Sequence, residues 1–148
     1  MTNDFEILIS GQQFKRVYEK KYNRITEKYG LHRIEIEILL FLQSTSLDTA
    51  KDIAEYSFFS KAHISNAIED LVRRGYLRGK PDEEDRRCVH LQLKEESLSV
   101  INEIKELRTN LSQLIYAGVS EEEKKIIFKV SKKIVRNISN ELLKESKR

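Results

Sequence analysis

The chain has 148 residues, 39% of them hydrophobic and 34% charged, and its 27 lysines and arginines against 24 aspartates and glutamates give a net charge of +3. This composition excludes a disordered chain, and the single cysteine excludes an intramolecular disulfide framework and a four-cysteine zinc site. The longest apolar run, residues 38–42, is far shorter than the roughly 20 residues that cross a membrane, and the acidic start is unlike a signal peptide. We therefore expect one soluble, cytoplasmic domain without membrane attachment.

Two amphipathic helices are expected in the N-terminal third of the chain. Within residues 4–29, apolar residues spaced by three or four run from Phe14 to Tyr29, and Gly30 follows directly as a helix stop. A more thoroughly apolar helix begins near Ile34 and is broken at residues 44–46. Five glycines and one proline are few turn residues, which favours long helices over an all-β fold.

The next segment has the pattern of a helix-turn-helix. Thr49 and Asp52 form a capping box at the start of a short helix that continues to Tyr56. After a turn, Ser60 is the next N-cap candidate, and apolar residues at helical spacing occupy positions 64, 67, 68, 71 and 72. Gly75 then ends this second helix.

The hydrophobic period then changes to that of a β-hairpin. Residues 76–80 and 88–93 are predicted to be short strands, and the second alternates apolar and polar side chains. The charged loop between them, residues 81–87, contains the only proline and ends with Arg86 and Arg87. A helix-turn-helix followed by a hairpin is a winged helix, which places its second helix in the DNA major groove and its hairpin, the wing, against the backbone or the minor groove.

Two further helices are expected after residue 94. Apolar residues from Val100 to Leu114 have coiled-coil spacing, and Gly118 breaks that helix. Ser120 and Glu123 form a second capping box, and an apolar stripe at 127, 130, 134, 138 and 142 follows. The fold class is therefore mostly α with a small β-hairpin wing. We divide it into an N-terminal dimerisation helix (1–30), a winged helix-turn-helix (31–94) and C-terminal dimerisation helices (95–148).

One face of the second helix of the helix-turn-helix has residue types that suit a DNA groove. Asparagine pairs with adenine, alanine contacts the thymine methyl group, and lysine or serine binds phosphates or bases. Because Glu69 and Asp70 do not suit DNA, we expect only the first two turns to lie deep in the groove. The same face also fits the solvated side of an amphipathic helix, but Arg86 and Arg87 have no role in the core. The predicted DNA-binding residues are Ser60, Lys61, Ala62, His63, Ser65, Asn66, Arg73, Arg86 and Arg87.

The stretch LVRRGYL at 71–77, the sequence Asp-Arg-Arg at 85–87 and CVHLQL at 88–93 together resemble the MarR (multiple antibiotic resistance regulator) family of bacterial transcription factors. DIAE at 52–55 and SKAHIS at 60–65 are similar to the helix-turn-helix of that family. The resemblance implies a homodimer whose terminal helices interleave and whose two winged helices bind a pseudo-palindromic site in double-stranded DNA. It also implies a repressor that an effector relieves.

For the wing, the resemblance implies that Arg87 reaches the minor groove, that Asp85 supports Arg87 through an ion pair, and that Arg86 lies along the phosphates. The acidic stretch at 82–84 departs from this picture, because it would repel phosphates if it pointed the same way as the arginines.

The terminal helices favour a homodimer independently of the resemblance. Their apolar stripes are too long for the compact middle, residues 31–94, to cover both, and uncovered stripes of that length promote aggregation. The alternative is that these helices pack only on one another within one chain.

Aromatic residues near the junction of the winged helix and the terminal helices fit either an effector pocket or the core. The pocket candidates are Tyr18, Tyr22, Phe41 and Tyr56, from a wider aromatic set that includes Tyr29, Phe58, Phe59 and Tyr76. The sequence does not name a ligand.

Cysteine and histidine chemistry give weaker candidates. Cys88 fits a redox switch or an incidental structural thiol. Because His32, His63 and His90 are too scattered for a local metal motif, we expect no metal and no cofactor, although a site assembled from distant carboxylates stays open.

The chain has no glycine-rich dinucleotide motif, phosphate-binding loop or nucleophile elbow, so we do not expect an enzyme. We expect a transcriptional regulator that binds double-stranded DNA. The alternative is a winged helix used for protein or RNA contact, and the salt dependence of duplex binding distinguishes the two.

Overall fold

The structure is a computed structural model that describes residues 4–57 and 59–147, so Phe58 of the aromatic set lies outside the described residues. The chain divides into two compact units, residues 1–109 and 110–148. The division at 30 and 94 into terminal dimerisation helices and a central winged helix stays a prediction.

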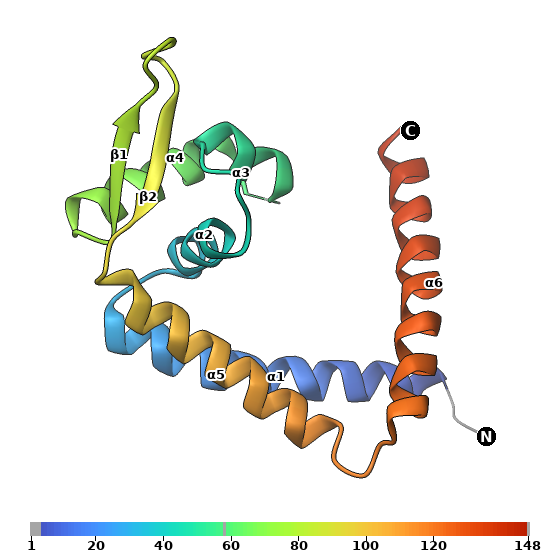
Figure 1. Cartoon of the computed structure of the whole chain (residues 1–148). Coiled ribbons are helices and arrows are strands. Elements are labelled where there is room, and N and C mark those ends of the chain that lie inside the picture. Colours follow the sequence, from blue (N-terminus) through green and yellow to red (C-terminus); the bar gives the residue numbers. More distant parts are fainter. Residues whose placement is uncertain (1–3, 58, 148) are drawn as a thin grey trace. The chain divides into compact units, whose positions relative to one another are not determined.

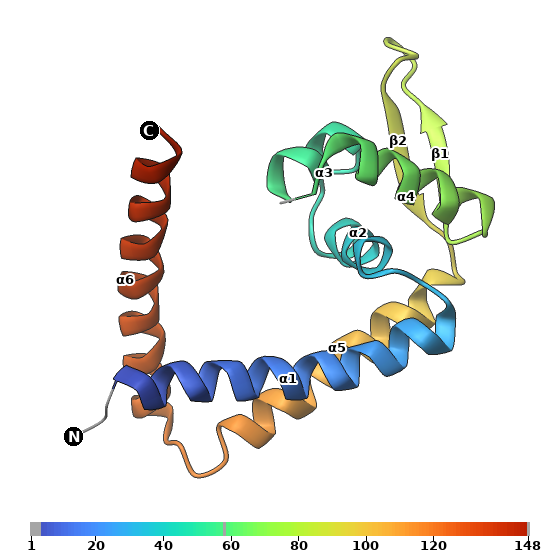
Figure 2. The ribbon, with the colours of Figure 1, turned by 180° about the vertical axis from the view of Figure 1, so that it is seen from behind.

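Helices dominate the described residues, with one two-stranded sheet (Figures 1 and 2). In chain order, the elements are α1 Asp4–Tyr29, α2 Arg33–Ser44, α3 Ala50–Tyr56, α4 Lys61–Arg73, β1 Leu77–Pro81, β2 Val89–Leu93, α5 Ser97–Ile115 and α6 Glu121–Ser146. This confirms the mostly α fold with a hairpin wing. Pro81, predicted in the loop, is the last residue of β1.

The predicted caps are present at the helix ends. The Asp52 N–H donates to Thr49 Oγ1 at 3.1 Å and the Thr49 N–H donates to Asp52 Oδ2 at 3.0 Å, which completes the capping box of α3. The Thr49 hydroxyl also donates to Asp52 Oδ2 at 2.7 Å, and this hydrogen bond, followed by the one from the Thr49 N–H, holds the pKa of the Asp52 carboxyl below its usual value. At α4, the His63 N–H donates to Ser60 Oγ at 3.2 Å. The Ser120–Glu123 box opens α6 in the same way.

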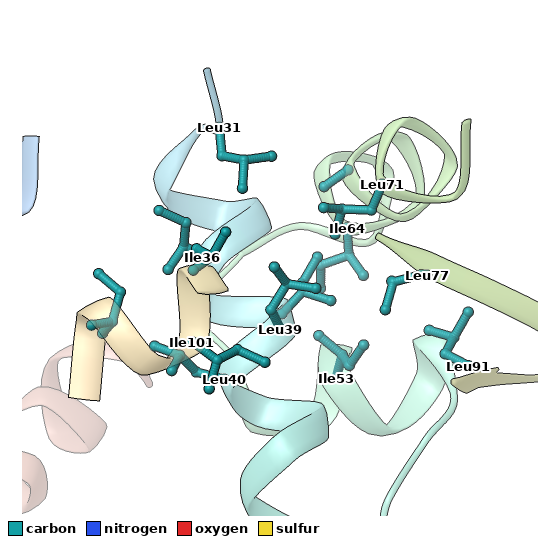
Figure 3. Close-up of a cluster of buried hydrophobic side chains, with 14 of the residues drawn as sticks. Leu31, Ile36, Leu39, Leu40, Ile53, Ile64, Leu71, Leu77, Leu91 and Ile101 are labelled. Carbon is teal, nitrogen blue, oxygen red and sulfur yellow. The ribbon is translucent and has the colours of Figure 1, made fainter. Parts of the chain in front are cut away.

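Both helix-turn-helix and wing contribute to one hydrophobic core (Figure 3). Its buried side chains come from helices α1 to α5 and from both strands, and include Tyr22, Ile36, Leu39, Ile53, Ile64, Leu71, Leu77, Leu91 and Ile101. Leu77 and Leu91 come from the two strands, so the base of the hairpin is fixed against the helices. This packing holds the wing beside α4 (Figure 1).

The wing is an antiparallel pair whose register runs from Leu77 opposite Leu93 to Pro81 opposite Val89. Gly79 stands opposite Leu91, and a Cβ added at position 79 would lie 2.9 Å from Cγ1 of Val89. The strands therefore approach closely here because position 79 has no side chain.

The N-terminal half of α5 lies beside α1 in both views (Figures 1 and 2). An ion pair between Lys28 of α1 and Glu103 of α5 joins them. This contact keeps the pKa of Lys28 raised and that of Glu103 lowered, each chiefly through their mutual hydrogen bond.

In the unit of residues 110–148, α6 has its predicted apolar stripe, but the stripe is uncovered. The side chains of Ile127, Val130, Ile134, Ile138 and Leu142 are 41–61% exposed. A basic face carries Lys125, Lys129, Lys132, Lys133 and Arg136. None of the helices that the structure describes has the length and apolarity needed to span a membrane.

Candidate nucleic-acid interface

Helix α4 has a core face and a solvent face, although Val72 of its predicted apolar stripe is exposed. Ile64, Ala67 and Leu71 are buried, spaced as one stripe. The predicted groove residues all lie outside that stripe and are exposed: Ser60, Lys61, Ala62, His63, Ser65, Asn66 and Arg73. The local pattern therefore brings these side chains to one accessible helix surface. Their contact with DNA stays a prediction.

Of the two acidic residues in the second half of α4, Glu69 is exposed, whereas Asp70 is paired with arginines within the protein. Asp70 forms ion pairs with Arg73 and, at 3.7 Å, with Arg74. A hydrogen bond from the Glu35 carboxyl and the arginine charges lower the pKa of Asp70, whereas burial raises that of Glu35. Asp70 thus has cationic partners of its own, which reduces the repulsion expected near phosphates. Part of the Arg73 charge is used in the same way.

Two of the four acidic residues of the wing loop, Asp82 and Asp85, hold the loop backbone through hydrogen bonds. One oxygen of Asp82, Oδ2, accepts the N–H groups of Glu84 at 3.1 Å and Asp85 at 3.0 Å. Asp85 Oδ1 accepts the Arg87 N–H at 3.1 Å. Asp82 is therefore turned toward the loop backbone, while the side chains of Arg86 and Arg87 are exposed.

The contact between Asp85 and Arg87 is a hydrogen bond to the main chain and not the predicted ion pair. Across residues 4–57 and 59–147, no ion pair joins these two side chains, and the Asp85 carboxylate holds the backbone of Arg87 instead. Because the Asp85 carboxylate accepts the main-chain N–H of Arg87 and not its guanidinium, the exposed Arg87 side chain is not held by Asp85.

His90 connects the wing to the loop before α3. Its Nδ1 lies 2.8 Å from Asp48 Oδ1 and its Nε2 lies 2.9 Å from Asp82 Oδ1. Hydrogen bonds to Asp48 and then Asp82 raise the pKa of His90, and the His90 contact lowers that of Asp82. The Leu91 N–H also donates to the Asp48 carbonyl oxygen at 2.8 Å. Sequence reasoning grouped His90 only with scattered histidines, because its partners lie 42 and 8 residues away.

The remaining cysteine and histidine candidates gain no support as reactive or metal sites. Burial and nearby carboxylates, Asp82 first among them, raise the pKa of the half-buried Cys88 thiol, opposite to the shift that activates a cysteine. Within the part of the chain that the structure describes, no three His, Cys, Asp or Glu side chains are grouped for metal binding.

The aromatic pocket candidates separate into two pairs. Phe41 and Tyr56, whose ring centroids are 6.1 Å apart, line a cavity of about 540 Å³ together with Arg33, Glu37 and Arg108. All of these residues belong to the unit of residues 1–109. The cavity therefore combines aromatic walls with two guanidinium groups and one carboxylate.

Tyr18 and Tyr22 do not line this cavity but support its polar groups. Tyr22 is buried and donates to Glu37 Oε1 at 3.2 Å, and burial together with Glu37 raises the pKa of Tyr22. The Arg33 guanidinium carbon lies 5.0 Å from the centre of the Tyr22 ring and 6.0 Å from that of Tyr18. Tyr22 therefore contacts both Glu37 and Arg33 of the cavity wall, and Tyr18 contacts Arg33.

Comparison with known proteins points to one family. The MarR family model matches residues 29–87. The HTH-type transcriptional regulator PecS of Dickeya dadantii is 28% identical over 126 residues, which are 80% of this chain and 76% of that protein. A MarR protein structure from Peptoclostridium difficile matches with a TM-score of 0.73 and 21% identity, covering 97% of this chain and 93% of that chain. The S. aureus MepR–DNA complex matches with a TM-score of 0.65 and 17% identity, covering 86% and 96%.

Proposed function

Because the MarR family model matches residues 29–87, we propose that this chain is a winged-helix regulator of that family and that it binds a pseudo-palindromic operator in double-stranded DNA as a homodimer. The observation that carries this proposal is the wing tip: Asp82 and Asp85 accept hydrogen bonds from the loop backbone, while Arg86 and Arg87 are exposed. A surface with this distribution of charge suits a polyanion.

In the proposed complex, the first two turns of α4 lie in the major groove. Asn66 is the residue suited to bidentate base recognition, and Ala62 is suited to contact with a thymine methyl group. Lys61, His63 and Ser65 flank them, and the Ser60 cap leaves the helix N-terminus pointing toward a phosphate. Arg73 lies at the outer end of the helix.

The wing provides a second set of contacts. Arg87 enters the minor groove and Arg86 lies along the backbone phosphates, as the family resemblance implies. Asp85 acts on the backbone of Arg87, so its contribution is to fix the loop from which the arginine extends. This contribution is conformational, because the two side chains form no ion pair within the described residues.

The homodimer is supported by the apolar side chains that α1 and α6 leave uncovered. Phe14 and Val17 of α1 are exposed, as is the whole stripe of α6 that includes Ile134. Apolar faces of this length need a partner surface. A second copy of the same chain provides a matching apolar surface, and most soluble oligomers are built from identical chains in this way.

Regulation by a small-molecule effector is the last part of the proposal. The cavity lined by Phe41 and Tyr56 has the size and the few polar groups that ligand pockets have. We propose that the regulator represses transcription until an effector binds there and changes the spacing of the two wings.

The proposal is tested by selecting bound duplexes from a random DNA pool and measuring affinity for the enriched sequence against salt. We expect a palindromic consensus and a steep loss of affinity with salt, because binding releases counterions from phosphates. Arg87→Ala should weaken binding about tenfold or more, which is the contribution of a hydrogen bond to a charged group.

Arg136→Ala is the matched control, since it removes the same charge from an exposed position on the basic face of α6. If both variants bind DNA with equal affinity, the wing assignment is wrong. If no duplex is enriched while RNA or a protein partner is retained, the winged helix is an interaction module without specific DNA binding.

A further inference from the structure

The C-termini of two helices, α1 and α4, meet at Arg74. Each helix ends in the same way, at a glycine with positive φ: Gly30 at 62° and Gly75 at 84°. After α4, the Gly75 N–H donates to the Val72 oxygen at 3.1 Å and the Tyr76 N–H donates to the Leu71 oxygen at 2.9 Å. This pair of hydrogen bonds is a Schellman motif.

The end of α1 has the same motif, and two carbonyl groups there accept no hydrogen bond from it. The N–H groups of Gly30 and Leu31 donate to the oxygens of Glu27 and Thr26, at 3.3 and 3.0 Å. The carbonyl oxygens of Tyr29 and Gly30 receive no hydrogen bond from this motif. They carry the negative end of the helix dipole, where a cation is favoured.

The Arg74 side chain fills this position. Its Nη1 donates to the Gly30 oxygen at 2.7 Å and its Nη2 donates to the Tyr29 oxygen at 2.8 Å. Arg74 is itself the C-cap residue of α4. One residue therefore ends the helix proposed to read DNA and binds the end of the helix proposed to form the dimer.

Further contacts fix the guanidinium in place. Asp70 lies 3.7 Å from Nη1, and the Tyr76 ring centre lies 5.5 Å from the guanidinium carbon. The side chain is only 30% exposed. A planar guanidinium held in this way fixes direction as well as distance, which a flexible ammonium group does not.

We propose that Arg74 is a positioning residue for DNA binding: it holds α4 at a set angle to α1 and so sets the separation of the two recognition helices in the dimer. This inference rests on the proposed function, since it needs a dimer that binds two half-sites. Because half-sites are read at a fixed helical spacing, a looser joint between α4 and α1 should relax the spacing preference.

The test compares full-length wild-type protein, Arg74→Ala and Arg74→Lys on two duplexes, one with the selected operator and one with a base pair inserted between its half-sites. We expect the wild type to discriminate strongly. In Arg74→Ala, the ratio of the two affinities should fall about tenfold, the weight of one hydrogen bond to a charged group. Arg74→Lys keeps the charge but cannot bridge both carbonyl groups, so it should lose part of the discrimination.

Lys28→Ala is the matched control, because it removes an ion pair at the same end of α1 that involves α5 and not α4. It should keep the wild-type ratio. If Arg74→Ala lowers the affinity for both duplexes equally and so keeps the ratio, Arg74 is only a structural residue and the inference is overturned. Where the alanine variant does not fold, the same result for Arg74→Lys overturns it. A wild type that ignores the insertion overturns the proposed dimeric function itself, and the inference with it.

Discussion

The exposed stripe of α6 gives a direct test of dimerisation through the change Ile134→Asp. Ile134 is 51% exposed. Fully burying an isoleucine stabilises by about 1.5–3 kcal/mol, so covering the exposed half contributes about 1 kcal/mol, and twice that in a symmetric dimer. Losing about 2 kcal/mol weakens association roughly thirtyfold. The buried carboxylate adds a desolvation cost, which makes this value a minimum.

The dimer dissociation constant is measured by analytical ultracentrifugation over a concentration series. Asn140→Asp is the control, because it places a carboxylate on the same helix away from the apolar stripe. We expect the control to dimerise like the wild type and Ile134→Asp to be largely monomeric at micromolar concentration. An unchanged dissociation constant for Ile134→Asp would refute the assignment of this stripe to the interface.

Two further predictions concern the DNA-binding face. Asn66→Ala should lower the discrimination between operator and random DNA by about 1–3 kcal/mol, the value of one bidentate base contact, as measured by competition binding; an equal loss on both DNAs would make Asn66 a phosphate-positioning residue. The raised pKa of His90 means that its contacts stabilise the fold fully below its ordinary value of 6.5 and that this stabilisation is lost as the pH rises through the raised value. The Tm advantage of the wild type over His90→Asn should therefore shrink as the pH rises above 6.5, and an advantage that does not change with pH would contradict the ionic role of His90.

Features that depend on neighbours in the chain were predictable from the sequence. The boxes at Thr49 and Ser120 and the stops at Gly30 and Gly75 depend on residues three or four positions apart, so the sequence contains all their partners. The exposed face of α4 follows from helical periodicity in the same way, because the stripe through Ile64 and its neighbours must be buried.

Contacts between distant residues were not predictable. Arg74 and the carbonyl groups that it binds are 44 and 45 residues apart, and no local pattern distinguishes it from Arg73, which the sequence placed among the DNA contacts. His90 and Asp48 are 42 residues apart. The role of Asp82 also escaped prediction, because whether a carboxylate faces the loop or the solvent depends on the loop conformation and not on its charge.

The close approach at Gly79 has a consequence for how the reach of the wing can change. Because a Cβ there would press on Cγ1 of Val89, and a β-branched side chain has little rotational freedom to yield, any larger residue must spread the strands at this point. The arginines lie beyond this point, toward the tip, whereas Leu77 and Leu91 remain anchored in the core. Position 79 therefore acts as a pivot, through which one substitution redirects the tip relative to α4 while every residue proposed to touch the nucleic acid keeps its identity.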